Sequence, residues 1–281
     1  MTTSMTREPF HWRTAIAYKT QPKIVIRGYD LNDLTGNVDL AEMAYLVWRG
    51  ELPSDSHRQM LNAIMVCIAE HAFSPSAAAA RIVASGGVPL HVAVSGGMLT
   101  IGELHGTFDR PAAMFQVGLA RGRTEGWSVE RLAETLVLEA HQGQRRLPGF
   151  HHPQHIRDPR SARLIELGQK LNVGGDHLAL ALAMEEATER CMRKRVWLNA
   201  VGVSGALLSD MGFTPELTKG VVLVARCISL VAHVFEEMSR EPGWRASRNT
   251  DITQPLDLEL QRPEFYDGPA DRPFPPERRK Q

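Results

Sequence analysis

The chain has 281 residues, and its 32 lysines and arginines balance its 32 aspartates and glutamates, so the formal net charge at pH 7 is zero. A chain of this length can bury a large core, in one large domain or in two smaller ones. Because there is no overall positive field, binding to nucleic acid or to an anionic membrane surface is not expected.

Cysteine usage and the N-terminal segment bear on the cellular compartment. Cys67, Cys191 and Cys227 lie far apart and match neither a disulfide framework nor a metal-binding pair. Residues 1–12 carry no apolar run, and no window of about twenty residues is apolar enough to cross a bilayer. These patterns predict a soluble cytoplasmic protein.

Helical periodicity covers most of the chain, and only residues 23–26 alternate like a short strand. Caps and breakers mark several boundaries: Gly50 ends one apolar stripe, Pro53 follows it, and the serines and aspartate at 54–56 can cap the next helix. The expected helices cover residues 40–50, 54–68, 76–84, 90–101, 129–142, 162–171, 177–194, 204–211 and 215–238. The sequence therefore predicts an all-α fold.

Charge and breaker density predict the domain organisation. Residues 109–195 carry more arginine and fewer long apolar runs than their flanks, so we expect them to form a smaller helical domain. It would be inserted into a large helical domain built from residues 1–108 and 196–240. Residues 241–281 are rich in proline and cannot form a long helix, so they are expected to be an extended arm.

A histidine-rich segment follows the turn at Pro148-Gly149. His151, His152 and His155 titrate near neutral pH, and the arginines after them keep a fixed positive charge. This combination suits a carboxylate-bearing substrate and proton movement at its carbonyl or hydroxyl group. The alternative is a solvated polar loop. Because no pair of histidines has helical ligand spacing with a third carboxylate, a metal site is not expected.

Several motifs occur in a fixed order along the chain. They are IRGYDL at 26–31, AYLVWRGELP at 44–53, LHG at 104–106, LPGFHH at 147–152 with DPR at 158–160, LNAVGVSG at 198–205, and VAR at 224–226. This combination resembles the citrate synthase family, and in particular its short citryl-CoA lyase members, over residues 15–238. The resemblance implies the family's all-α architecture, with a large domain and a smaller inserted one.

The resemblance also implies roles for matching residues. His105 resembles the histidine that stabilises the enol of acetyl-CoA, which needs a neutral donor beside a developing oxyanion. His152 resembles the histidine on the oxaloacetate carbonyl, the oxygen that becomes the citrate hydroxyl. His71, Arg160 and Arg226 resemble the residues that hold the carboxylates, where a guanidinium can bind both oxygens.

Coenzyme A and subunit partners follow from the same resemblance. The turn with Leu147, Gly149 and Phe150 resembles the backbone that recognises the CoA adenine, and Arg157 is assigned to CoA as well. No cofactor is expected to be bound permanently, and a CoA thioester is the expected co-substrate beside a small-molecule carboxylate. The apolar helices at 90–101 and 221–235 have few polar positions, so a homodimer is also expected.

Each of these assignments has a structural alternative. His71 after an apolar helix, or His105 at a helix end, could be a capping or surface residue. Arg226 interrupts the apolar stretch 221–228, where an unpaired charge would be costly, so an anionic partner is expected. That partner could be a ligand or a structural carboxylate.

One departure from the family pattern bears on the chemistry. Val201 stands where the family has its catalytic aspartate, and an apolar side chain cannot shuttle a proton, which would slow condensation by the family route about 10²–10⁴-fold. His151 also replaces a glycine, and residues 107–109 replace a small, glycine-rich sequence. Both changes are expected to add bulk where CoA would pass.

The sequence thus favours a carbon–carbon lyase of the citryl-CoA lyase type, which cleaves or forms a citrate-like hydroxy acid from a 2-oxo acid and an acyl-CoA. Water or Asp109 would return the final proton. The alternatives are a catalytically silent relative that binds a di- or tricarboxylate, and a remodelled decarboxylase or hydrolase that does not use CoA. Val201 favours the silent relative, whereas the retained histidines and arginines favour an enzyme.

Overall fold

The computed structural model describes residues 12–152, 155–241, 243–245 and 272–273, so most of the predicted arm at 241–281 lies outside the described residues. A small antiparallel sheet, in the order β1-β2-β3, precedes the helices. Its strands are β1 (Ala17–Lys19), β2 (Ile24–Ile26) and β3 (Tyr29–Asp30). The helices are α1 (Leu31–Leu34), α2 (Leu40–Arg49), α3 (Asp55–Ala69), α4 (Pro75–Ser85), α5 (Leu90–Met98), α6 (Asp109–Glu125), α7 (Val129–Gln142), α8 (Pro159–Lys170), α9 (Asp176–Met192), α10 (Ala200–Asp210) and α11 (Pro215–Arg240). The prediction of a helical fold is confirmed, with this sheet as the exception.

Local sequence signals explain many of the helix boundaries. Asp39 and Glu42 form a reciprocal capping box at the start of α2, and Gly50 ends the helix in a left-handed conformation with φ of 92°. Proline opens α4, α8 and α11, at a position where its missing N–H costs no helical hydrogen bond. These helices were predicted because their signals are local.

The sequence interpretation missed α1, α6, the strands β1 and β3, and the first turns of α8 and α10. Pro111 lies in the first turn of α6, where a helix tolerates proline. Gly118 and Gly122 dilute the apolar pattern of α6 because α7 packs closely there: an added Cβ would come within 2.9 Å of Leu136 and Leu132, respectively. Glycine therefore stands in α6 where apolar side chains would otherwise have revealed the helical period.

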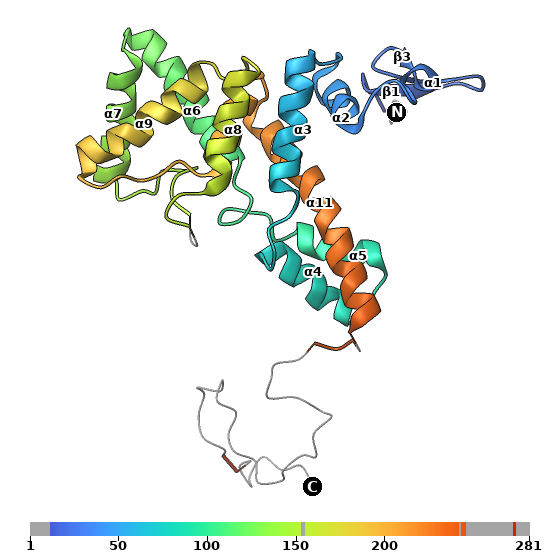
Figure 1. Ribbon diagram of the computed structural model, residues 1–281. Coiled ribbons are helices and arrows are strands. Elements are labelled where there is room, and N and C mark those ends of the chain that lie inside the picture. Colours follow the sequence, from blue (N-terminus) through green and yellow to red (C-terminus); the bar gives the residue numbers. More distant parts are fainter. Residues whose placement is uncertain (1–11, 153–154, 242, 246–271, 274–281) are drawn as a thin grey trace, which may run out of the picture.

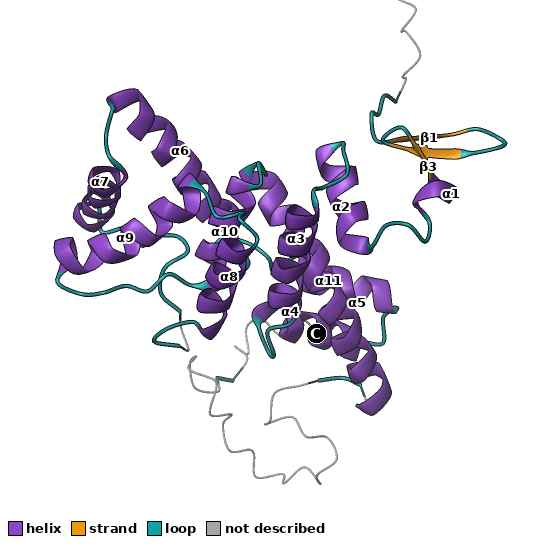
Figure 2. Ribbon diagram, turned by 45° about the horizontal axis from the view of Figure 1, so that its top comes forward, coloured by secondary structure: helices purple, strands orange, loops and turns teal. Residues whose placement is uncertain are grey.

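The helices form two groups joined by α3 and α11 (Figure 1). On one side lie α6, α7, α8 and α9, and on the other α4 and α5 pack against the C-terminal half of α11; a turned view shows the same separation (Figure 2). One hydrophobic cluster includes Ile64 of α3, Phe115 of α6, Met184 of α9 and Leu207 of α10. Because this core crosses the predicted boundaries at 109 and 195, the division into a large and an inserted domain stays a prediction.

Helix α11 is long and apolar. An 18-residue window within Pro215–Arg240 has a mean hydropathy of 1.6, so by length and composition it could cross a membrane, contrary to the sequence expectation. In the fold it packs against α3, α4, α5 and α6, and its middle carries the buried Arg226. The core helix of a globular protein meets the same criterion, and the absence of a membrane partner stays a prediction.

Candidate active site

Three interhelical loops and two helices bring the predicted site residues together. His71 lies between α3 and α4, His105 between α5 and α6, and His152 between α7 and α8. The rings of His71 and His152 meet edge to face with centroids 5.9 Å apart. Arg160, in the first turn of α8, and Arg226, in the middle of α11, both act electrostatically on His71, and Arg226 also acts on His105. The five residues therefore form one cluster, in which the two arginines supply the fixed positive charge.

Arg226 is the most telling member of this cluster. Arg226 is only 7% exposed, and its Nη1 is buried without a hydrogen-bond partner among the described residues. Burial lowers the pKa of the guanidinium, Glu70 raises it, and the nearby charge of Arg160 lowers it further. Because a buried unpaired cation is costly, this geometry favours an anionic ligand at Arg226.

Arg160 is held in place by Asp158. The carboxylate of Asp158 accepts hydrogen bonds from Nε and Nη2 of Arg160, both at 2.9 Å, and from the backbone N–H of Ala200 at 2.9 Å. Burial raises the pKa of Asp158, but these hydrogen bonds outweigh it and lower the pKa to about 2. Asp158 thus joins the start of α8 to the start of α10 and keeps the guanidinium of Arg160 in a fixed orientation.

His152 is 8% exposed, and its Nδ1 accepts a hydrogen bond from the backbone N–H of His155 at 3.2 Å. An imidazole whose Nδ1 accepts carries its proton at Nε2 when neutral. Burial lowers the pKa of His152 below its ordinary value, Asp158 opposes this, and His155 and Arg160 add to it. A neutral ring with a proton at Nε2 can donate a hydrogen bond to a carbonyl or alkoxide oxygen.

His105 is also set up as a neutral group. Its Nε2 lies 2.9 Å from the hydroxyl oxygen of Ser76, in the first turn of α4. Burial lowers the pKa of the ring, and the charges of Arg226 and His71 lower it further. The pKa of His71 is lowered in the same order, by burial first and then by Arg160 and Arg226. Neutral imidazoles suit hydrogen-bond donation to a developing oxyanion.

The predicted CoA-binding turn is fixed against α10. Phe150 forms an isolated antiparallel bridge with Leu198, and the backbone N–H of Asn199 donates to the carbonyl of Gly149 at 2.9 Å. Gly149 has a φ of 81°, and a Cβ added there would lie 2.5 Å from Cα of Gly202. Only glycine fits this close approach, whereas Leu147 at the start of the turn is half-buried.

Arg157, the other residue assigned to CoA, lies on an aromatic ring. Its guanidinium carbon is 4.8 Å from the centroid of Trp197, and that of Arg195 is 4.3 Å from the same ring. Stacking of this kind holds an exposed arginine in place while its N–H groups stay available. The two guanidinium groups on Trp197 therefore place positive charge beside the loop that carries His152.

The residues expected to modify the chemistry lie in different surroundings. Val201 lies half-buried in the first turn of α10 and packs against the core. Phe108, the cap residue of α6, is only 5% exposed and packs into the core, and its effect on a CoA path stays a prediction. The exposed His151 has a φ of 66°.

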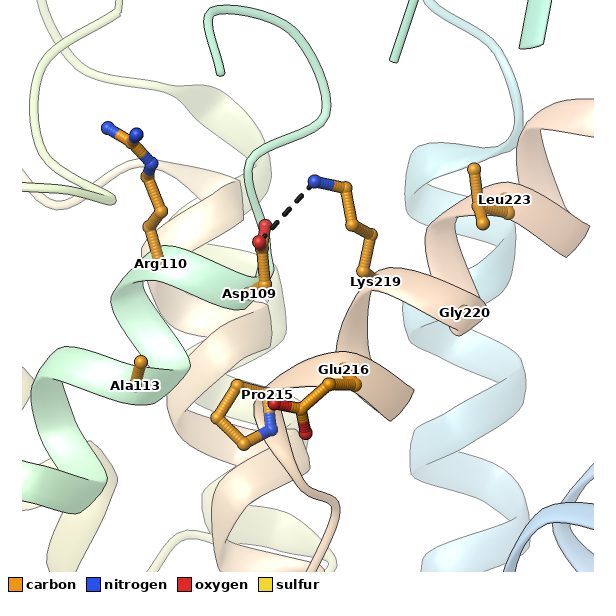
Figure 3. Close-up of a pocket in the computed structure, with 8 residues that line it drawn as sticks. All are labelled: Asp109, Arg110, Ala113, Pro215, Glu216, Lys219, Gly220 and Leu223. Carbon is orange, nitrogen blue, oxygen red and sulfur yellow. Dashed lines mark hydrogen bonds and ion pairs between the residues drawn. The ribbon is translucent and has the colours of Figure 1, made fainter. Parts of the chain in front are cut away.

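Asp109 lines a groove of ≈ 390 Å³ between the N-terminal turns of α6 and α11, and none of the groove's lining residues is a histidine (Figure 3). Its Oδ2 is 3.4 Å from Nζ of Lys219, and Figure 3 shows the two side chains facing each other across the groove. The role of Asp109 in returning the final proton stays a prediction.

Sequence reasoning overlooked Asp158, Ser76 and Glu70. An Asp-Pro pair before a helix signals an N-cap, which could have identified Asp158, but its bond to Ala200 depends on tertiary structure. Ser76 and Glu70 contact site residues from elsewhere in the chain, and no local pattern marks them. Within the described part of the chain, no group of three or more histidine, cysteine or acidic side chains is placed to hold a metal ion.

Fold and site together define an all-α protein in which two arginines, one of them buried, lie among three imidazoles whose pKa values are lowered. The family described as "Citrate synthase, C-terminal domain" matches residues 53–248, and the chain belongs to the citrate synthase family. The solved citryl-CoA lyase from Hydrogenobacter thermophilus is 34% identical, with a TM-score of 0.82 over 95% of this chain and 98% of that one.

Curated relatives are longer than this chain. Citrate/2-methylcitrate synthase of Bacillus subtilis is 29% identical over 194 residues, which are 67% of this chain and 50% of that protein. Glyoxysomal citrate synthase of Cucurbita maxima is 27% identical over 198 residues, 68% of this chain and 37% of that protein. The chain thus spans about half or less of the length of these relatives.

Proposed function

We propose that this chain is a carbon–carbon lyase of the citryl-CoA lyase type, which cleaves a citrate-like hydroxy-acyl-CoA into a 2-oxo acid and an acyl-CoA, or runs the reverse reaction. The observation that carries the proposal is Arg226, whose buried Nη1 has no hydrogen-bond partner among the described residues and which acts electrostatically on His71 and His105. Similarity to the Hydrogenobacter thermophilus citryl-CoA lyase over nearly the full length of both chains supports the reaction type.

The reaction can be assigned to groups of this site. In cleavage, the bond between the hydroxyl-bearing carbon and the α-carbon of the thioester breaks, and its electron pair moves to the α-carbon as an enolate. His152 would stabilise the oxygen that changes from hydroxyl to carbonyl, and His105 the enolate oxygen. The hydroxyl proton passes to water, and water returns one proton at the α-carbon, so the proton balance is zero.

Protonation of the α-carbon is the step that differs from the family pattern. Val201 offers no carboxylate, and Asp109 is paired with Lys219, so we propose that water supplies this proton. Protonation of the enolate and removal of the methyl proton pass through the same transition state, so the missing carboxylate slows this step equally in cleavage and in condensation.

The second candidate is a catalytically silent carboxylate-binding relative, and Val201 is the observation that favours it. A remodelled decarboxylase or hydrolase that does not use CoA would require that Phe108 or His151 obstruct a CoA path, and Phe108 is buried in the core. Calorimetric titration with oxaloacetate, citrate and CoA, separately and together, discriminates among them. A lyase binds both the carboxylate and CoA; a protein that binds the carboxylate alone would contradict the proposal.

We also propose that the chain forms a homodimer in the cytoplasm. Val224, Ile228, Val231, Phe235 and Met238 on α11 are each at least 40% exposed and recur at the three- and four-residue spacing of one helix face. A monomer would leave this apolar stripe in water. Light scattering at micromolar concentration should give the mass of a dimer, and Ile228→Asp with Phe235→Asp should shift it to a monomer; a monomeric unmodified chain would refute the proposal.

A further inference from the structure

The turn that carries His71 has an unusual backbone. Ala72 adopts a φ of 48°, in the left-handed region that favours glycine. The carbonyl of Ala72 accepts a hydrogen bond from the N–H of Ser74 at 2.8 Å, so the chain reverses directly after His71 and enters α4. A non-glycine residue keeps this conformation only where its surroundings hold it, and such residues cluster at functional sites.

Glu70 supplies the contacts that hold this turn. Both oxygens of its carboxylate lie 3.2–3.3 Å from Nε2 of His233, two helical turns after Arg226 on α11. The carboxylate thus joins the left-handed turn to the helix that carries Arg226.

The remainder of the turn is fixed by aromatic contacts. The ring of Phe73 lies with its centroid 6.0 Å from that of His233, and the guanidinium of Arg81 lies 5.4 Å from the ring of Phe73. His233 therefore touches both ends of the turn, Glu70 before His71 and Phe73 after it. These contacts fix the backbone on either side of the imidazole.

We propose that Glu70 is a positioning residue of the substrate site: its carboxylate ties the turn at residues 70–73 to His233 of α11 and so orients His71 towards the ligand. The assignment rests on the proposed function, because it takes a carboxylate as the ligand that His71 helps to bind. Glu70 itself does not touch the substrate. Its action passes through the backbone of residues 70–72.

The negative charge of Glu70 would weaken carboxylate binding, whereas its hold on the turn would strengthen it. Glu70 brings negative charge towards Arg226, where an anionic ligand is expected to bind. If charge alone mattered, neutralising Glu70 would tighten carboxylate binding. If the turn matters, removing the hydrogen-bond acceptor would weaken binding, because His71 would leave its orientation. Glutamine keeps an acceptor oxygen without the charge, whereas alanine keeps neither, so the two substitutions separate the effects.

The test measures oxaloacetate binding by calorimetry for Glu70→Gln, Glu70→Asp and Glu70→Ala in the full chain. We expect Glu70→Gln and Glu70→Asp to bind within about twofold of the unmodified chain or more tightly, and Glu70→Ala to bind about tenfold more weakly. Adding Ala72→Gly to Glu70→Ala should recover part of the loss, because glycine adopts the left-handed conformation without strain. Glu139→Ala, which removes another half-exposed acid paired with an arginine, serves as the control.

A second measurement does not depend on any substrate. Titration of the His71 imidazole by NMR should give a pKa below the ordinary value in the unmodified chain and in Glu70→Gln, and a pKa nearer the ordinary value in Glu70→Ala, as the ring becomes exposed to water. If Glu70→Ala changes neither binding nor the pKa of His71, the positioning role is refuted. If the unmodified chain binds no oxaloacetate but His71 titrates as expected, the proposed function fails and the positioning role stands.

Discussion

The two halves of the candidate site differ in how much of the family chemistry they keep. The carboxylate half, made of His71, His152, Arg160 and Arg226, has its cations buried or fixed by hydrogen bonds. The thioester half keeps His105 and the glycine turn before His151 but carries Val201 in place of an acid. We therefore expect affinity for a carboxylate and the ability to enolise a thioester to be separable in this chain, with the first kept more completely than the second.

The largest effect should come from restoring the acid. Val201→Asp places a carboxylate between Asn199 and Ser204 in the first turn of α10 and should create or raise citrate synthase activity, by about 10²–10⁴-fold if a general base contributes its usual share. Release of CoA from acetyl-CoA and oxaloacetate measures this gain, and Val201→Asn is the matched control. If the aspartate variant stays inert while it binds oxaloacetate, the thioester half differs by more than one side chain.

Removing the buried cation should disable the carboxylate half. Arg226→Leu should weaken oxaloacetate or citrate binding roughly 100-fold, the usual cost of losing charge-assisted hydrogen bonds in a buried site. Its thermal stability should stay equal or rise, because an unpaired buried charge is replaced by an apolar side chain. Arg163→Leu, at a surface ion pair, should leave binding unchanged. Undiminished calorimetric affinity in Arg226→Leu would show that the anion binds elsewhere.

Substitution of the two histidines should lower turnover, whereas substitution of Arg226 should lower affinity. His105→Ala and His152→Ala should each lower lyase turnover roughly 100-fold or more, because oxyanion stabilisation and proton transfer act in the transition state. Initial rates with citryl-CoA measure this, and melting temperatures show whether the variants are folded. If both keep full activity, the two-histidine mechanism is wrong.

The smallest effect concerns the stability of the fold at acid pH, to which Asp158 contributes. The pKa of Asp158 is about 2 against an ordinary 3.8, so its ionised form stabilises the fold above pH 3.8 and this contribution is lost as the pH falls from 3.8 towards 2. The shift corresponds to about 2 kcal/mol at neutral pH. Asp158→Asn should lower stability at pH 7 and show a flatter decline below pH 4 in denaturant unfolding. An unchanged acid profile would show that Asp158 is not the linked group.

How far the sequence predicts this molecule depends on the range of the interactions involved. Helices with their own caps and apolar stripes, such as α2 and α7, were predicted at or near their observed bounds. Helix α6 was missed because its glycines reflect close packing against α7, which no local pattern reveals. The five principal site residues could be named from the resemblance to the family, and they do lie together, although their roles stay predictions.

Contacts between distant segments account for what the sequence did not predict. The bond from Ser76 to His105 and the contact between Glu70 and His233 join residues far apart in the chain. Phe108 was expected on a substrate path because of its position after the His-Gly turn, and only tertiary packing shows that its ring lies in the core. The elements that supply partners across the fold were the ones that local reasoning could not find.

The rate at which the unmodified chain releases oxaloacetate from citryl-CoA tests the central claim most directly. The account predicts turnover at neutral pH, with one acetyl-CoA formed per oxaloacetate, and no release above background for Arg226→Leu. If the unmodified chain binds citrate or oxaloacetate but releases no oxaloacetate from citryl-CoA, the protein is a silent carboxylate-binding relative and the lyase assignment is wrong.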